Sequence, residues 1–123
     1  MRIGIIGLPD SGKTTTFNAL TRGRVPTGAG GRRGANVGVA QVPDGRLAVL
    51  SEMHNRSPLV PAEVTYVDLP EAADARGGPF AGEAVTHLQR VDALLAVVRA
   101  FDNPSVPHPK ETVDYRRDIT DIA

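Results

Sequence analysis

Eight consecutive residues near the amino end constrain this chain more than any other feature. They match the spacing G-x-x-x-x-G-K-[ST]. The apolar run at residues 2–6 precedes them and is typical of a buried strand, and residues 15–20 favour a helix. Because this spacing is diagnostic only between a strand and a helix, we predict a phosphate-binding loop rather than a turn that binds nothing. The eight residues are Gly7, Leu8, Pro9, Asp10, Ser11, Gly12, Lys13 and Thr14.

The residue types in this loop suit an oligophosphate. Glycine lets the backbone curl around an anion, and N–H groups at a helix N-terminus direct positive charge at it. Lys13 adds a charge for the β- and γ-phosphates, which makes it the candidate catalytic residue. The hydroxyl of Thr14 suits Mg²⁺. The residues expected to hold the nucleotide are Pro9, Asp10, Ser11, Gly12, Lys13, Thr14 and Thr15.

A second polar position is expected at the same edge of the sheet. Asp68 closes the apolar run 63–69, so it would lie at the carboxyl end of a strand, beside the phosphate-binding loop. There Asp68 could hold Mg²⁺ opposite Thr14, directly or through water. The alternative is that Asp68 only caps the following turn. We favour the metal role because the phosphate-binding loop is present.

Composition narrows the other functions. Lys plus Arg and Asp plus Glu balance at 14 each, so the net charge does not indicate a nucleic-acid or membrane partner. The chain contains no cysteine, which excludes disulfides and thiolate metal sites. The amino end is a strand rather than a secretion signal, and no apolar run reaches the length of a membrane span. We therefore expect a cytoplasmic protein without a membrane partner.

Strands and helices alternate along the chain. We expect strands at 2–6, 36–42, 63–69 and 93–98, the last covered on both faces. Helices are expected after the loop to about residue 22, around Leu47 to Met53, and at 83–91 and 111–123. Two glycine-containing loops, 23–34 and 70–82, read as mobile, switch-like segments. This order predicts a single domain over residues 1–123 with an open α/β sheet and the ligand at the strands' carboxyl ends. The connection between the second and third strands leaves their relative direction open.

Several segments outside the phosphate-binding loop resemble the YchF/Obg-like family of P-loop GTPases and ATPases, of the translation-factor-related class. They occur in the family's order over nearly the whole chain. They are residues 1–9, Phe17-Asn18-Ala19-Leu20-Thr21, Asn36-Val37-Gly38-Val39, Val42-Pro43-Asp44 with Arg46-Leu47, Val97-Val98-Arg99 before Phe101, and Asp114 leading into Arg117-Asp118-Ile119.

The resemblance implies an open, three-layer, mainly parallel sheet of the P-loop NTPase type. Its strand order would be two-three-one-four, with strands two and three antiparallel at one edge. It also implies binding of GTP or ATP, slow hydrolysis and association with ribosomes. The chain ends before the family's base-reading motif, so the sheet would be truncated and the base is not determined. The strand at 93–98 would then be an open edge through which the chain could self-associate.

Two positions depart from the family's pattern. Arg32 stands where the family has a threonine that closes on the metal, and Glu71 replaces a glycine that contacts the γ-phosphate. No glutamine follows to orient a water, because Ala72 stands there, so weak or no hydrolysis is expected. The alternative function is a non-hydrolysing interaction module that keeps the fold. A small-molecule kinase also fits the loop, but the second half shows no arginine-bearing lid.

The remaining charged residues do not indicate one particular function. Arg22, Arg24, Arg32 and Arg33 could contact RNA or a ribosome, could place Arg32 or Arg33 over the γ-phosphate, or could keep a loop soluble; we favour the last reading because no aromatic residue interleaves them. His54, His87 and His108 lack the spacing of a helical metal pair, and the first and last read as loop residues. The pairs Arg116/Arg117 and Asp118/Asp121 read as an exposed helix face.

Overall fold

The computed structural model describes residues 1–27, 34–69 and 83–123. The chain alternates strands and helices in the described part, as expected. The elements are β1 (Arg2–Ile6), α1 (Lys13–Thr21), β2 (Asn36–Gln41), α2 (Arg46–Met53), β3 (Glu63–Asp68), α3 (Glu83–Leu88), β4 (Ala93–Ala96) and α4 (Tyr115–Ile122). Residues 28–33 of the first predicted loop and all of the second, 70–82, lie outside the described residues.

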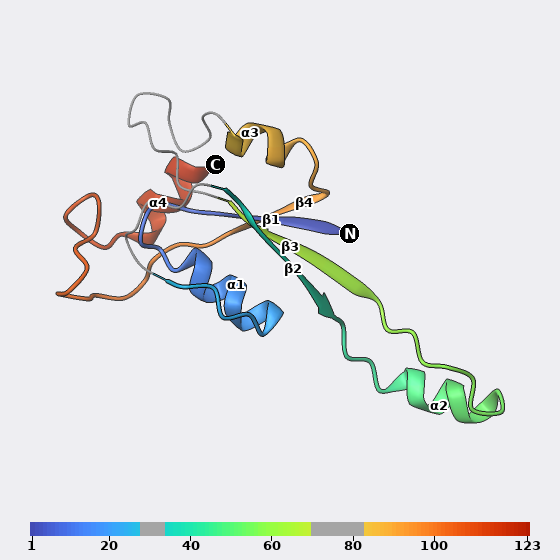
Figure 1. The fold of residues 1–123 in the computed structure, drawn as a ribbon. Coiled ribbons are helices and arrows are strands. Elements are labelled where there is room, and N and C mark those ends of the chain that lie inside the picture. Colours follow the sequence, from blue (N-terminus) through green and yellow to red (C-terminus); the bar gives the residue numbers. More distant parts are fainter. Residues whose placement is uncertain (28–33, 70–82) are drawn as a thin grey trace.

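The described strands form one open sheet in the order β2-β3-β1-β4 (Figure 1). β1 pairs in parallel with β3 and with β4, whereas β2 runs antiparallel to β3 at the edge. The predicted fold class, strand order and antiparallel edge are therefore confirmed. Because β1 and β3 are parallel, their carboxyl ends lie at the same end of the sheet. The end of β3 and the loop that follows β1 are therefore neighbours.

Helices lie on both faces of the sheet, so the fold has three layers (Figure 1). On one face Ile6 and Val67 pack with Ile122 of α4 in a buried cluster, and Leu88 and Val91 pack against it. α1 covers the other face with the buried Phe17. A Cβ on Gly38 would lie 2.7 Å from Thr21 Cγ2 and 2.9 Å from Phe17 Cζ. Glycine in β2 therefore lets α1 approach the sheet closely.

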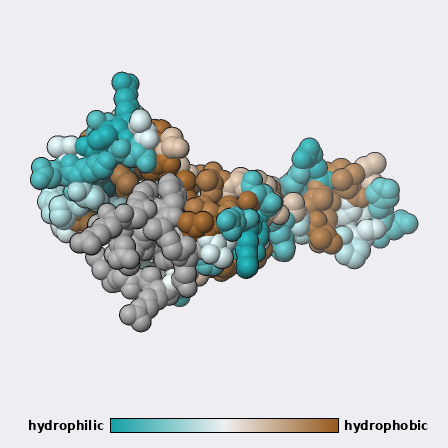
Figure 2. All heavy atoms as spheres, turned by 90° about the horizontal axis from the view of Figure 1, so that it is seen from above, coloured by the Kyte–Doolittle hydropathy of each residue, from teal (hydrophilic) through white to brown (hydrophobic). Residues whose placement is uncertain are grey.

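β2 and β3 continue beyond the sheet into an arm with α2 at its tip (Figure 1). The N–H of Val42 donates to Ala62 O, which extends the pairing by one step. No residue of α2 is buried. Apolar side chains gather along this arm, where Figure 2 shows brown atoms between polar ones. The exposed ones are Val42, Val49, Leu50, Met53, Leu59 and Val60.

β4 differs from its prediction. It spans four residues, and Leu94 and Leu95 are 55% and 36% exposed, so the expectation of cover on both faces is wrong. The reason is its place in the sheet: within the described residues β4 pairs only with β1 and forms an edge. That edge position is the one expected for a sheet of this family without its later strands.

The last two helices are shorter than predicted. α3 ends at Leu88, where i→i+3 bonds from Arg90 to His87 and from Val91 to Leu88 tighten the chain. α4 begins only at Tyr115, because Asp114 caps it by accepting from the N–H groups of the second and third residues after it. The described helices include none long and apolar enough to cross a membrane.

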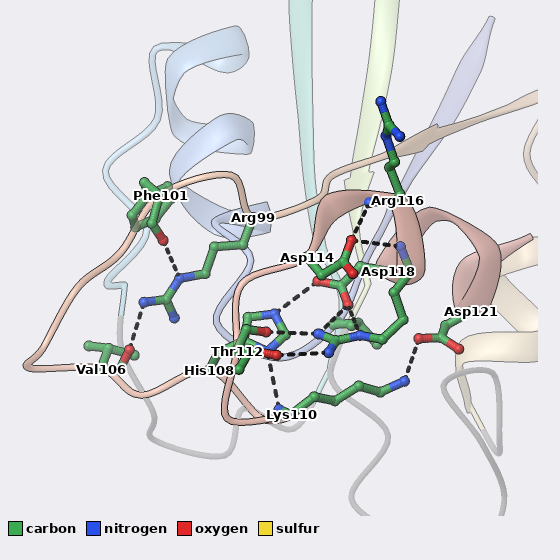
Figure 3. A network of polar contacts seen from close by, with 12 residues as sticks. Arg99, Phe101, Val106, His108, Lys110, Thr112, Asp114, Arg116, Asp118 and Asp121 are labelled. Carbon is green, nitrogen blue, oxygen red and sulfur yellow. Dashed lines mark hydrogen bonds and ion pairs between the residues drawn. The ribbon is translucent and has the colours of Figure 1, made fainter.

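The prediction that Asp118 lies on an exposed helix face is wrong. Asp118 is 1% exposed, and the loop residue His108 is 7% exposed. His108 Nε2 lies 2.9 Å from Asp118 Oδ2, and the N–H of Lys110 donates to His108 Nδ1 (Figure 3). Nε2 therefore carries the hydrogen and donates it to Asp118. Burial raises the pKa of Asp118, but hydrogen bonds from Arg117 and His108 outweigh it and leave that pKa below its ordinary value.

Arg99 organises the loop before this pair. It is 2% exposed and lies 5.0 Å from the ring of Phe101. Its Nε donates to Phe101 O at 3.0 Å and its Nη2 to Val106 O at 2.7 Å (Figure 3). The guanidinium thus holds the chain between β4 and His108 in a closed turn.

Candidate nucleotide site

The predicted phosphate-binding loop, residues 7–14, lies between β1 and α1, at the carboxyl end of β1. Gly7 lies against the backbone of Val97, the residue that follows β4. A Cβ at Gly7 would lie 2.3 Å from Val97 O and 2.7 Å from Ser11 Oγ. Asp10 and Gly12 have φ of 57° and 98°. Gly12 thus adopts a conformation that favours glycine, as its place in the pattern predicts, whereas the positive φ of Asp10 was not predicted.

Two polar side chains of the loop are buried. Lys13 is 7% exposed, and its Nζ donates to Leu8 O at 2.9 Å, so the side chain folds back over the loop. Ser11 is 5% exposed, and its Oγ has no hydrogen-bond partner within the described residues. Gly12 is the N-cap of α1, and no side chain from the described residues caps it. A buried hydroxyl and the uncapped start of a helix fit an anion.

A hydrogen bond joins the loop to the end of β3. Thr14 Oγ1 donates to Asp68 Oδ2 at 2.8 Å, and Asp68 is 3% exposed. The sequence therefore correctly predicted that these two residues lie together. Because the Thr14 hydroxyl donates its hydrogen to Asp68, its lone pairs are left for a cation. An uncharged oxygen beside a carboxylate is the kind of donor set that Mg²⁺ accepts together with phosphate oxygens and water. The residues present fit this ion.

Asn36 belongs to the same group and was not predicted. Its Nδ2 donates to Asp68 Oδ2 at 3.1 Å, from the first residue of β2. The antiparallel pairing places Asn36 directly opposite Asp68. The signal available in the sequence was an asparagine that opens one strand and an aspartate that closes its neighbour.

The other predicted residues lie around this group. Pro9, Asp10 and Thr15 are exposed, on the outside of the loop and of the first turn of α1. Arg32, Glu71 and Ala72 lie outside the described residues. Within the described ranges, three or more His, Cys, Asp and Glu side chains do not gather anywhere as a metal cluster.

Known proteins resemble this chain over nearly its whole length. Residues 2–122 match the family described as 50S ribosome-binding GTPase. The chain belongs to the 50S ribosome-binding GTPase family. The predicted kinship with YchF and Obg-like proteins is confirmed by individual relatives. The chain is 35% identical over 129 residues to the ribosome-binding ATPase YchF of Bacillus subtilis, covering 97% of this chain and 34% of that protein.

Two further relatives extend the comparison. Obg-like ATPase 1 of Xenopus laevis is 33% identical over 123 residues, covering 97% of this chain and 31% of that protein. The structure of the YchF GTPase of Schizosaccharomyces pombe superposes with a TM-score of 0.69 at 32% identity, covering 98% of this chain and 33% of that one. The chain thus spans about a third of the length of these relatives.

Proposed function

We propose that this chain binds a purine nucleoside triphosphate, GTP or ATP, together with Mg²⁺. The observation that carries the proposal is the hydrogen bond from Thr14 to Asp68, beside a lysine folded into the loop. Residues 10–15 would surround the phosphates with backbone N–H groups. Thr14 and Asp68 would hold the Mg²⁺, Asp68 directly or through water, and Mg²⁺ would neutralise charge on the phosphates.

Lys13 is the proposed catalytic residue. Its ammonium group already lies in the loop and would move from Leu8 O to the β- and γ-phosphates, where it stabilises developing negative charge. No glutamine stands at positions 71 and 72 to orient a water. Hydrolysis by this chain is therefore expected to be slow, and single-turnover release of phosphate measures it.

Ribosome association is proposed from kinship. The family's description and the Bacillus subtilis relative's name both refer to ribosome binding. Such a role would place the chain in the cytoplasm. Ribosome co-sedimentation with each nucleotide tests it, and equal recovery with and without ribosomes would contradict it.

Nucleotide titration tests the central proposal. Fluorescent GTP and ATP are titrated with Mg²⁺ and with EDTA, and Lys13→Ala is expected to weaken binding more than tenfold, about 1.4 kcal/mol or greater. The matched control is Lys110→Ala, which removes the chain's other lysine, one that pairs with Asp121 of α4. Binding that is unchanged in Lys13→Ala, or absent in the unaltered chain, would refute the proposal.

The second candidate is a non-hydrolysing interaction module. The departures at Arg32 and Glu71 favour it, because both replace residues through which the family senses the γ-phosphate. Comparing GDP with GTP, and ADP with ATP, separates the two functions. Equal affinity for diphosphate and triphosphate, or no Mg²⁺ dependence, supports the interaction module.

A further inference from the structure

One oxygen of Asp68 is held from two directions. Asp68 Oδ2 accepts from the Thr14 hydroxyl at 2.8 Å and from the Asn36 amide at 3.1 Å. The donors come from the start of α1 and the start of β2, whereas the acceptor ends β3. Three elements that are distant in sequence therefore meet at this carboxylate, which is 3% exposed.

The place of Asn36 follows from the sheet. Residues directly opposite in an antiparallel pair project to the same face and lie within reach of short side chains. Asn36 opposes Asp68, and Gly38 lies two residues further along β2 on that face. Because Gly38 has no side chain, α1 packs closely on this face and brings Thr14 to Asp68. A shift of β2 by one residue would turn the Asn36 amide to the opposite face.

We propose that Asn36 is a positioning residue for the metal site. The inference rests on the proposed function, since it assigns Asn36 to the carboxylate that would hold Mg²⁺. By donating to Oδ2, the amide restricts rotation of the Asp68 side chain and keeps the carboxylate at Thr14. Hydrogen-bond partners that orient a metal-binding carboxylate commonly change metal affinity by about 10–100-fold when they are removed. Asn36 acts in this way, through Asp68.

The test separates metal affinity from folding and from nucleotide affinity. Fluorescent GTP or ATP is titrated into the 123-residue chain over a range of Mg²⁺ concentrations and in EDTA. In Asn36→Ala the Mg²⁺ concentration that gives half of the Mg²⁺-dependent increase in nucleotide affinity should rise by roughly tenfold or more. The nucleotide affinity measured in EDTA should stay within about twofold of that of the unaltered chain. Asn36→Leu, which keeps the side-chain volume, should show the same split. The thermal unfolding midpoint verifies that both variants fold.

Gln41→Ala is the matched control, because it removes an exposed amide side chain from the other end of β2. It should bind nucleotide and Mg²⁺ as the unaltered chain does. If both Asn36 variants keep the unaltered Mg²⁺ dependence, the positioning role is wrong while the proposed function stands. If the unaltered chain itself shows no Mg²⁺ dependence, the metal site is wrong and the role of Asn36 falls with it.

Discussion

The Cα of Gly7 lies so close to the Val97 carbonyl that a Cβ at this position would stand 2.3 Å from the oxygen. The contact is between backbones, because the N–H of Val97 also donates to Ile6 O at 2.8 Å. The first glycine of the predicted phosphate-binding loop therefore lets the loop pack against the chain that continues β4.

Gly7→Ala should destabilise the protein and weaken nucleotide binding. The methyl group has no space beside a backbone carbonyl, so we expect a loss of about 1–3 kcal/mol in the free energy of unfolding, measured with urea. Gly45→Ala is the control, since nothing lies within 4 Å of a Cβ there, and its change should stay within about 0.5 kcal/mol. Equal stability of the two variants would refute the steric account.

Gly38→Ala tests the close approach of α1 to β2. Its Cβ would meet Thr21 Cγ2 at 2.7 Å and the ring of the buried Phe17 at 2.9 Å. We expect a loss of about 1–3 kcal/mol in chemical denaturation. The loss should be smaller in a Thr21→Ser background, which removes Cγ2 and keeps the hydroxyl that donates to Phe17 O. A double-mutant cycle with no coupling would show that the helix moves instead.

Asp118 makes stability depend on pH in the acid range. Its pKa in the folded protein lies below the ordinary value of 3.8, because hydrogen bonds from Arg117 and His108 outweigh the effect of burial. A lowered pKa means that the contribution is full above the ordinary value and is lost as the pH falls through the folded pKa. The difference in unfolding free energy between the unaltered chain and Asp118→Asn should therefore be large at pH 7 and shrink at strongly acid pH.

The control for this titration is Asp121→Asn. Asp121 pairs with Lys110 at the surface, where its side chain is 35% exposed. Ion pairs of this kind contribute about 0–1 kcal/mol, so the variant should follow the unaltered chain at every pH. A gap for Asp118→Asn that stays constant with pH would contradict the assignment.

The sequence predicted the sheet and the first half of the site for definable reasons. A strand, a loop and a helix in that order place Thr14 at one edge of the sheet, and an aspartate at the end of a parallel strand reaches the same edge. Asn36 could not be found in this way, because its contact depends on the register of β2 against β3. The resemblance implied that these two strands are antiparallel but did not give their register.

Asp118 was misplaced for a different physical reason. Charged residues on a short helix usually face water, and its partner His108 comes from a loop whose path depends on the carbonyl contacts of Arg99. The available signal was that Asp118 stands four residues before Ile122 and so shares its inward face. The exposure of Leu94 was missed because an apolar run of strand residues does not say whether a neighbour covers it.

Self-association through β4 is the remaining expectation. Leu94 and Leu95 are exposed on an edge strand of the described sheet, and such edges pair with other chains. Sedimentation at tens of micromolar should show dimers or larger species, and Leu95→Lys should shift them toward monomer. Val49→Lys, which removes an exposed apolar side chain from α2, should leave the distribution unchanged. If the unaltered chain sediments as a monomer, the prediction of self-association through β4 is wrong.

The arm that ends in α2 is a suitable site for attaching a label. Its tip contributes no buried residue and stands away from the Thr14–Asp68 group (Figure 1). A fluorophore or spin label attached there after a single cysteine is introduced would be chemically unique, because the chain has no cysteine of its own. Such a probe would report tumbling and docking of the whole domain and would leave the proposed nucleotide site at the other end unaltered.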